Sequence, residues 1–342
     1  MSENIKIKYD SKCFGKGHPS YNGKNDLEFT WYKLMWAAIT VGKSGWLDIK
    51  TNNWINLAKF KKSMIELFLE NKMIKVKGKD INRLYASANY QDLDGSERGS
   101  INYFLGIFTA KLFAAKMLNC PWLMHLDAYS KDKGKLEPIF KVTGKSLATT
   151  KRPDLIGIIQ KQINDSSGKP YIHKGYVAIE AKGRYSRDHD ALDNAKKEQL
   201  DNLKLINKTS PLKIAIMSYF TITRKEFRVS WQDPDQVNEQ YFDIEFSQEE
   251  FLYYYYYGVY RLIYESDSTF EVVIEKKIIL CSRIDDLVVG LDIDIFSNIH
   301  NDNRQDLVNL FYDTDFLEFH ETDNYRIKGV LGPDRILVGI FS

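Results

Sequence analysis

The chain has 342 residues, 44% hydrophobic and 27% charged, proportions that are ordinary for a globular protein. Its length corresponds to about two to three domains. No apolar run approaches the roughly 18 uncharged residues of a membrane span, and the polar start MSENIKIKYDSK lacks the apolar core of a signal peptide. Three widely spaced cysteines, Cys13, Cys120 and Cys281, fit a reducing compartment better than a disulfide framework. These features predict a cytoplasmic protein without membrane association.

Charge is distributed unevenly, although the formal net charge is only +2. Residues 1–230 contain 40 Lys and Arg against 23 Asp and Glu, whereas residues 231–342 contain 8 against 23. A basic body can bind a polyanion through phosphate contacts and counterion release. The acidic remainder can dock on that body, bind a basic partner or shield the polyanion site. The asymmetry favours nucleic acid as a partner, and the alternative is a charged surface that is merely solvated.

Residues 1–90 are predicted to form a mainly helical region after a loose start that contains Gly and Lys. The runs WYKLMWAAITV and WINLAKFKKSMIELFLENKMI have the apolar spacing of helices. The polar segment SANYQDLDGSERGS separates this region from the next one.

Residues 91–230 are predicted to alternate between helix and strand. Ser100 is the expected N-cap of a buried helix, INYFLGIFTAKLFAAKML, which Pro121 ends. Strands are predicted at WLMHLDAY, DLIGIIQ and GYVAIEAKG, then a helix over about residues 188–207, then a strand at LKIAIMSYFTI. The order helix, three strands, helix, strand predicts an α/β fold.

Residues 231–342 are predicted to form an acidic region of mixed α and β structure. A helix, FLYYYYYGVYRLIYES, precedes the β-like runs FEVVIEKKIIL, LVVGLDIDIF and YRIKGVLGPDRILVGIF. The five consecutive tyrosines, Tyr253 to Tyr257, cover both faces of that helix. Packing against neighbouring elements is the preferred interpretation, and a surface for a second copy or a protein partner is the alternative.

The third predicted strand carries an acid and a lysine on one face. Because side chains alternate across a strand, Glu180 and Lys182 point to the same side. Burying such charges is costly unless they are paired or bind a metal. Asp154 opens the preceding strand, so it lies beside Glu180 if the two strands pair. Two adjacent carboxylates repel each other unless a cation holds them, and Mg²⁺ takes oxygen ligands.

These residues together contain the parts needed for metal-assisted hydrolysis of a phosphodiester. The Ala181 carbonyl is placed to be a further metal ligand. Lys182 can orient the attacking water or stabilise charge at phosphorus.

Pro153-Asp154 followed by Glu180-Ala181-Lys182 resembles the signature of the PD-(D/E)xK (restriction endonuclease-like) nuclease superfamily. The predicted order of elements over roughly residues 96–222 is similar to the core of that family. The resemblance implies Asp154 and Glu180 as metal ligands and Lys182 as the catalytic lysine.

Two further residues follow from the resemblance. Many members have an acid on the helix before the first core strand, where Glu97 stands, and a Gln on the helix after the lysine, where Gln199 stands. Gln199 also falls on the apolar stripe of the predicted helix 188–207, where a polar group needs a partner. The alternatives are a Gln that reaches solvent and a Glu that simply favours a helix start.

An acid two residues before a lysine is a common pattern, so its setting matters. The rival pair is Glu275 and Lys277, in a strand-like run with Pro234-Asp235 upstream. No predicted strand follows that Pro-Asp, and no polar helix follows Lys277, so the pair at 180 and 182 is preferred.

Basic residues flank the preferred site and are expected to grip phosphates. They are Lys145, Lys151 and Arg152 before the second strand, and Arg184, Arg187, Lys196 and Lys197 after the third. Some of them can equally serve only to solubilise the surface.

The sequence therefore predicts a Mg²⁺-dependent nuclease that hydrolyses DNA, with Mn²⁺ as a substitute metal. A restriction-like or anti-phage defence setting rests on the resemblance alone. The alternatives are an RNase and a catalytically inactive protein that binds nucleic acid or a partner on a nuclease-like fold. The acidic, Tyr-rich C-terminal region is expected to serve as a dimer or partner surface.

Overall fold

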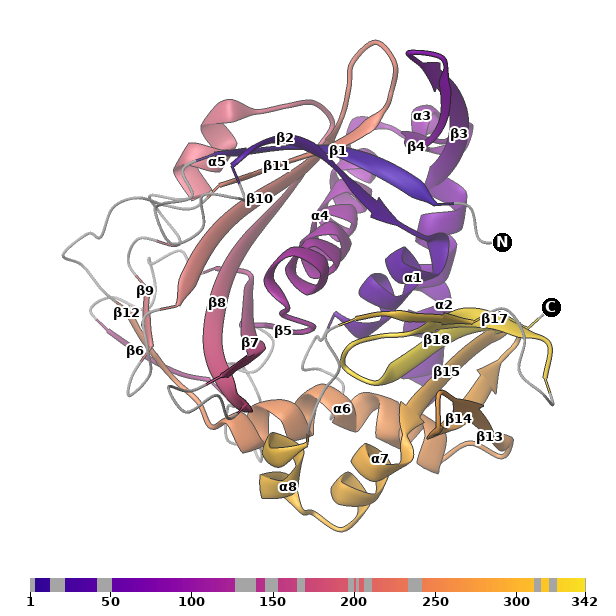
Figure 1. The fold of residues 1–342 in the computed structure, drawn as a ribbon. Coiled ribbons are helices and arrows are strands. Elements are labelled where there is room, and N and C mark those ends of the chain that lie inside the picture. The colour runs from indigo at the N-terminus through magenta and orange to yellow at the C-terminus, as the bar shows by residue number, and fades with distance from the viewer. Residues whose placement is uncertain are drawn as a thin grey trace.

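A large mixed sheet lies at the centre of this α/β protein (Figure 1). The computed structural model describes residues 4–12, 22–41, 51–126, 140–144, 153–164, 170–195, 200, 203–205, 211–232, 242–310, 315–319 and 325–341. The strand order is β3-β4-β1-β11-β10-β8-β7-β5, with β2 also paired to β1. The strands are β1 (Ile5–Lys12), β2 (Gly23–Phe29), β3 (Leu69–Val76), β4 (Lys79–Ala86), β5 (Trp122–His125), β7 (Leu155–Asn164), β8 (Pro170–Arg184), β10 (Leu212–Phe220) and β11 (Phe227–Gln232).

Two smaller sheets and eight helices accompany the large sheet in the described residues. One sheet contains β6 (Lys141–Gly144), β12 (Phe242–Glu245) and β9 (Leu203–Leu205). The other has six strands: β13 (Thr269–Ile274), β14 (Lys277–Ile284), β15 (Leu287–Asp292), β18 (Ile336–Phe341), β17 (Ile327–Leu331) and β16 (Leu317–Phe319). The helices are α1 (Trp31–Thr40), α2 (Thr51–Phe68), α3 (Ala88–Asp92), α4 (Gly95–Leu118), α5 (His189–Ala195), α6 (Gln248–Tyr264), α7 (Ile293–His300) and α8 (Arg304–Asn309).

The prediction of a mainly helical N-terminal region is wrong, because residues 1–90 also contain β1 to β4. In β1, Ile5, Ile7 and Tyr9 are buried while the polar residues between them are more exposed. This alternation is the period of a strand with one buried face. The predicted helix through Ile74 ends at Phe68, where β3 begins. Strands of the N-terminal region therefore extend the same sheet that contains β7 and β8.

Helix α4 begins earlier than predicted, with Asp94 rather than Ser100 as its N-cap. The Asp94 carboxylate accepts the amide hydrogens of Ser96 and Glu97, and the Glu97 carboxylate accepts that of Asp94, which forms a capping box. Among the described helices, α4 alone is long and apolar enough to span a membrane, but 72% of its apolar stretch is buried inside the fold. It packs against β8 and α1 as the core helix that its composition predicts.

The predicted helix over residues 188–207 is shorter than expected. Helix α5 covers His189–Ala195, and Leu203–Leu205 forms β9, which pairs in parallel with β12. The apolar stripe that placed Gln199 on a helix face therefore does not continue through Leu203. In the C-terminal region, LVVGLDIDIF is likewise divided, since β15 ends at Asp292, whose carboxylate caps α7.

A buried polar network joins the C-terminal region to the body. Lys111 of α4 donates to the Tyr255 hydroxyl over 2.5 Å, and that hydroxyl donates to Asp334 Oδ2 over 2.6 Å. Trp36 of α1 donates to the other Asp334 carboxylate oxygen over 3.0 Å. The Tyr256 hydroxyl donates to the Asp334 carbonyl, so two of the five consecutive tyrosines pack in the interior as predicted. Burial lowers the pKa of Lys111 to about 8 and raises that of Asp334.

Ion pairs on the surface continue the same contact. Lys33 of α1 pairs with Glu318, while Lys59 and Lys62 of α2 pair with Asp285 and Asp286 at 2.7 and 3.1 Å. Acidic residues of the C-terminal region therefore contact basic residues of the body. The C-terminal region therefore docks on the basic body, which is one of the roles expected for it.

We expect Lys111→Met or Asp334→Asn to lower the free energy of unfolding by about 3 kcal/mol each, because either change leaves a buried polar partner uncompensated. The double variant should lose clearly less than the sum of the two. Urea titrations measure all three values, and Lys59→Met, which breaks an exposed pair, should cost about 1 kcal/mol or less. Additive losses at 111 and 334 would show that the two residues do not act together.

Candidate active site

The pairing of β7 with β8 brings Asp154 and Glu180 together. The two strands are antiparallel, with Leu155 opposite Ile179, so the next pair in register is Asp154 and Glu180. The Asp154 amide donates to Glu180 Oε2 over 3.0 Å, and the Ala181 amide donates to Asp154 Oδ2 over 3.0 Å. The predicted side-by-side arrangement of the two acids is therefore confirmed.

The end of β7 explains why these side chains interlock. Strand β7 begins only at Leu155, two residues after Pro153, which the register places opposite Ala181, so the ladder stops before the Ala181 amide finds a backbone partner. The Asp154 carboxylate takes the place of that partner. Pro153 immediately before it has no amide hydrogen and favours an extended entry into the strand. At this strand end the Asp154 carboxylate therefore accepts the hydrogen bond that a backbone carbonyl accepts elsewhere in the sheet.

Lys182 completes the predicted trio. Its ammonium group contacts Glu180 Oε1, and its side chain is 22% exposed, whereas the Glu180 side chain is fully buried. The trio therefore has a buried acid at its base and an amine that solvent reaches. A substrate that approaches this surface meets the lysine and Asp154 first, since Asp154 is also partly exposed.

Burial and charge repulsion make Glu180 hard to ionise. Burial, followed by the neighbouring Asp154 carboxylate, raises the pKa of Glu180 to about 8, and Lys182 only partly opposes this shift. The close contact between the two carboxyl groups adds to this rise. Such a pair holds either a proton or another cation between its oxygens.

The donor set fits a hard divalent cation. It consists of two carboxylates and the Ala181 carbonyl, which projects from the same strand edge as the Ala181 amide and so toward Asp154. Within the described ranges there is no group of three or more His, Cys, Asp and Glu side chains that could hold a metal ion. Mg²⁺ is commonly held by one or two carboxylates plus water and substrate oxygens, whereas Zn²⁺ needs more protein ligands. The residues present therefore suit Mg²⁺ better than Zn²⁺.

Two glycines fix the site on α4. A Cβ at Gly183 would overlap the carbonyl of Asn102, and a Cβ at Gly106 would lie 2.8 Å from the Gly183 nitrogen. Helix and strand therefore touch backbone to backbone directly beside Lys182. Since side chains alternate, Gly183 faces α4, and Glu180 and Lys182 face the opposite side of the sheet.

The other predicted site residues are more scattered. Glu97 is exposed, and its carboxylate caps α4, so its interaction is the local one that helix starts favour. Arg184 lies 3.6 Å from Asp188, and Arg187 pairs with Asp10 of β1 at 2.8 Å. The remaining candidates lie outside the described residues: Lys145, Lys151, Arg152, Lys196, Lys197 and Gln199.

Sequence reasoning missed the continuation of this surface into the N-terminal strands. The Asp10–Arg187 pair shows that β1 reaches the segment that follows β8. The signal was present in the alternation of IKIKYDSK, which places Lys6, Lys8 and Asp10 on one face.

The free energy of unfolding should depend on pH through Glu180. When a chelator removes divalent metal, the Glu180 carboxyl of the folded protein binds its proton more tightly than the same carboxyl in the unfolded chain, which has the ordinary pKa of 4.5. Stability from this group is therefore present at low pH and falls as pH rises through about 8. Urea titrations at several pH values should show that the free energy of unfolding of Glu180→Gln falls less with rising pH than that of wild type. Glu70→Gln on the exposed strand β3 should follow the wild-type profile. Parallel profiles for wild type and Glu180→Gln would contradict the shift.

Gly183→Ala should destabilise the fold by about 1–3 kcal/mol, because the added carbon forces β8 away from α4. Gly175→Ala on the same strand is the matched control, since its Cβ would meet only Ile159 at an ordinary 3.7 Å. Thermal or urea unfolding measures both variants. Equal stability of the two would mean that the close approach at Gly183 is easily relieved.

Comparison of the chain with protein-family models, with curated proteins and with solved structures finds no match. The chemistry of the chain is therefore inferred from the geometry of Asp154, Glu180 and Lys182.

Proposed function

We propose that the chain is a Mg²⁺-dependent nuclease that hydrolyses phosphodiester bonds of DNA. One observation carries the proposal: Asp154, Glu180 and Lys182 meet at the end of two paired strands, where Glu180 accepts from the Asp154 amide, Asp154 accepts from the Ala181 amide, and Lys182 pairs with Glu180. Residues 26 and 28 positions apart in sequence form one cluster there. Perturbed titration of a carboxylate beside a partly exposed cation is typical of functional sites.

The arrangement of elements supports the resemblance to the PD-(D/E)xK superfamily. In chain order the structure has α4, β5, β7, β8, α5 and β10, with the short strands β6 and β9 inserted. In the sheet β5, β7, β8 and β10 are consecutive neighbours; β7 is antiparallel to both β5 and β8, and β10 is parallel to β8. We propose that these elements form the restriction endonuclease-like core that the sequence predicts.

Each residue of the trio has a distinct task in the proposed reaction. Asp154, Glu180 and the Ala181 carbonyl would hold the metal, which supplies Lewis acidity and a lowered water pKa when bound. Lys182 lies on the exposed side, where its ammonium can donate to a phosphate oxygen or to the attacking water. The Glu180 carboxylate holds that ammonium in place, and the buried setting strengthens the interaction.

Purified protein should nick plasmid DNA with Mg²⁺ or Mn²⁺, and a chelator should stop the reaction. Glu180→Gln and Lys182→Met should each lower the rate by at least about 100-fold, because Glu180 would hold the metal and Lys182 would contact the reacting phosphate or the attacking water. Agarose electrophoresis measures nicking, and circular dichroism checks that the variants fold.

Strand β3 offers a matched control, because Glu70 and Lys72 have the same spacing and pair at 2.7 Å on an exposed strand. Because Lys72 also lines a basic cavity, Glu275→Gln, which has the same spacing from Lys277 in the six-stranded sheet, is the better activity control and should nick DNA at the wild-type rate. Equal activity of Glu180→Gln and wild type would reject the site. Cleavage of RNA alone would make the chain an RNase, and binding without cleavage would favour an inactive nucleic-acid-binding protein.

A further inference from the structure

The face of the sheet that carries Glu180 and Lys182 is polar across four further strands. In register, Arg184 of β8 neighbours Tyr219 of β10, then Arg228 of β11, then Lys8 of β1. Side chains of residues in register point to the same face, so this row runs across the sheet directly beside the trio. Asp26 of β2 ends the row.

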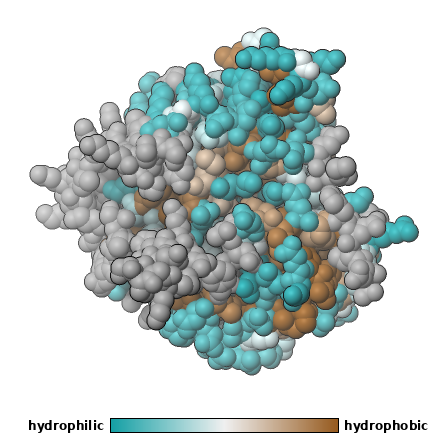
Figure 2. Space-filling view, viewed as in Figure 1, coloured by the Kyte–Doolittle hydropathy of each residue, from teal (hydrophilic) through white to brown (hydrophobic). Residues whose placement is uncertain are grey.

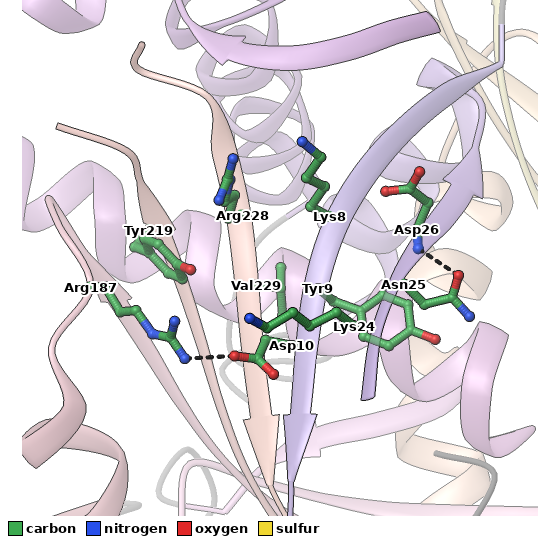
Figure 3. Close-up of a pocket in the computed structure, with 10 residues that line it drawn as sticks. All are labelled: Lys8, Tyr9, Asp10, Lys24, Asn25, Asp26, Arg187, Tyr219, Arg228 and Val229. Atoms are coloured by element: carbon green, nitrogen blue, oxygen red, sulfur yellow. Dashed lines mark hydrogen bonds and ion pairs between the residues drawn. The ribbon is translucent and has the colours of Figure 1, made fainter. Parts of the chain in front are cut away.

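A cavity of about 450 Å³ lies over this row (Figure 3). Figure 3 shows Arg228 and Lys8 extending beside each other from neighbouring strands, with Arg187 turned toward Asp10. Lys24 of β2 also lines the cavity. Four cations from four different segments therefore surround a single hollow.

Two more cavities continue the hollow in both directions. One shares Asp10 and Arg187 with the first and extends under α5. The other, of about 650 Å³, shares Lys8 and extends to the hairpin of β3 and β4. The second one is lined by Lys72, Lys75, Lys77 and Arg224.

Charge along the three cavities is strongly positive. Together they are lined by nine Lys and Arg side chains and four Asp and Glu side chains. Three of the acids pair with arginines, Asp10 with Arg187, Asp26 with Arg83 and Glu226 with Arg228, and Glu226 also lies 3.6 Å from Lys8, so five more cations than acids line the cavities. The excess positive charge faces solvent, where the upper part of the surface over β1 and β2 is mostly hydrophilic (Figure 2).

We propose that these three cavities form a track that binds a DNA strand leading away from the Glu180–Lys182 site to the β3–β4 hairpin. The track rests on the proposed function, since it supplies the path of the substrate beyond the scissile bond. Backbone phosphates are its ligands, because its polar lining is mainly ammonium and guanidinium groups from several strands. It contains no residue that was expected from sequence to bind nucleic acid except Arg187.

The length of the track sets the length of substrate that uses it. Three strand spacings separate β8 from β1, which is about 14 Å. At the duplex spacing of about 3.4 Å per nucleotide, the strand covers roughly four nucleotides before it reaches Lys8, and an extended single strand covers fewer. Short substrates bound at the trio alone therefore do not contact Lys75 or Arg224.

Binding of a labelled 20-nucleotide single-stranded DNA, measured by fluorescence anisotropy in EDTA, tests the track. Lys75→Glu/Arg224→Glu should weaken binding about tenfold or more and reduce the salt slope by about 1.4, the value for two lost phosphate contacts. Lys276→Glu/Lys328→Glu is the control, with the same charge change at exposed positions in the β13–β14 turn and in β17.

The outcomes separate the track from the nuclease proposal. If Lys75→Glu/Arg224→Glu (the hairpin variant) binds the 20-nucleotide DNA more weakly than the control variant does, the track is supported, even if wild type cuts no DNA with any metal. Equal weakening by both double variants would leave only a non-specific charge effect and would overturn it. So would failure of wild type to bind the 20-nucleotide strand, or DNA cleavage by wild type with unchanged binding by the hairpin variant.

Discussion

The hydrogen bond from the Ala181 amide to the Asp154 carboxylate is the constraint on which the candidate site depends. It replaces the backbone hydrogen bond that Ala181 would make with residue 153 if β7 were two residues longer. Because it uses a side chain, it draws that carboxylate against Glu180. The same bond that closes the ladder therefore creates the repulsion between the two acids. A fold that needed only a sheet at this position would have no reason to place a second acid opposite the first, since a carboxylate beside the buried Glu180 destabilises it.

The rest of the molecule holds this strand end in place. Backbone contact between Gly183 and α4 fixes β8 from one side of the sheet. Helix α4 is itself tied by Lys111 to Tyr255 and Asp334, so the acidic C-terminal region completes the core that supports the helix. That region is thus part of the supporting structure of the body, whatever else its surface binds.

Much of the fold and of the Asp154, Glu180 and Lys182 site could be predicted from sequence, because the residue patterns that indicate them span only a few positions. The apolar stripe of α4, the strand runs of β7 and β8 and the two-residue spacing of Glu180 and Lys182 are all short-range signals. Errors arose where a local pattern had two meanings. IKIKYDSK alternates as a strand, but its lysines suggested a loose start, and only pairing with β11 and β2 makes it a strand. The stripe through Leu203 fits a helix equally well, yet pairing with β12 makes Leu203–Leu205 a strand. Long-range pairing decides such cases, and a single sequence does not contain it.

The glycine contact between α4 and β8 also bears on how a polymer could be accommodated. With no side chain between them, helix and strand behave as one rigid unit. Adjustment to a bound strand must then come from long side chains such as Lys8 and Arg228 on the opposite face, which can change rotamer without moving the backbone. The backbone that positions Asp154 and Glu180 would then stay fixed, while the long side chains beside them adjust to what they bind.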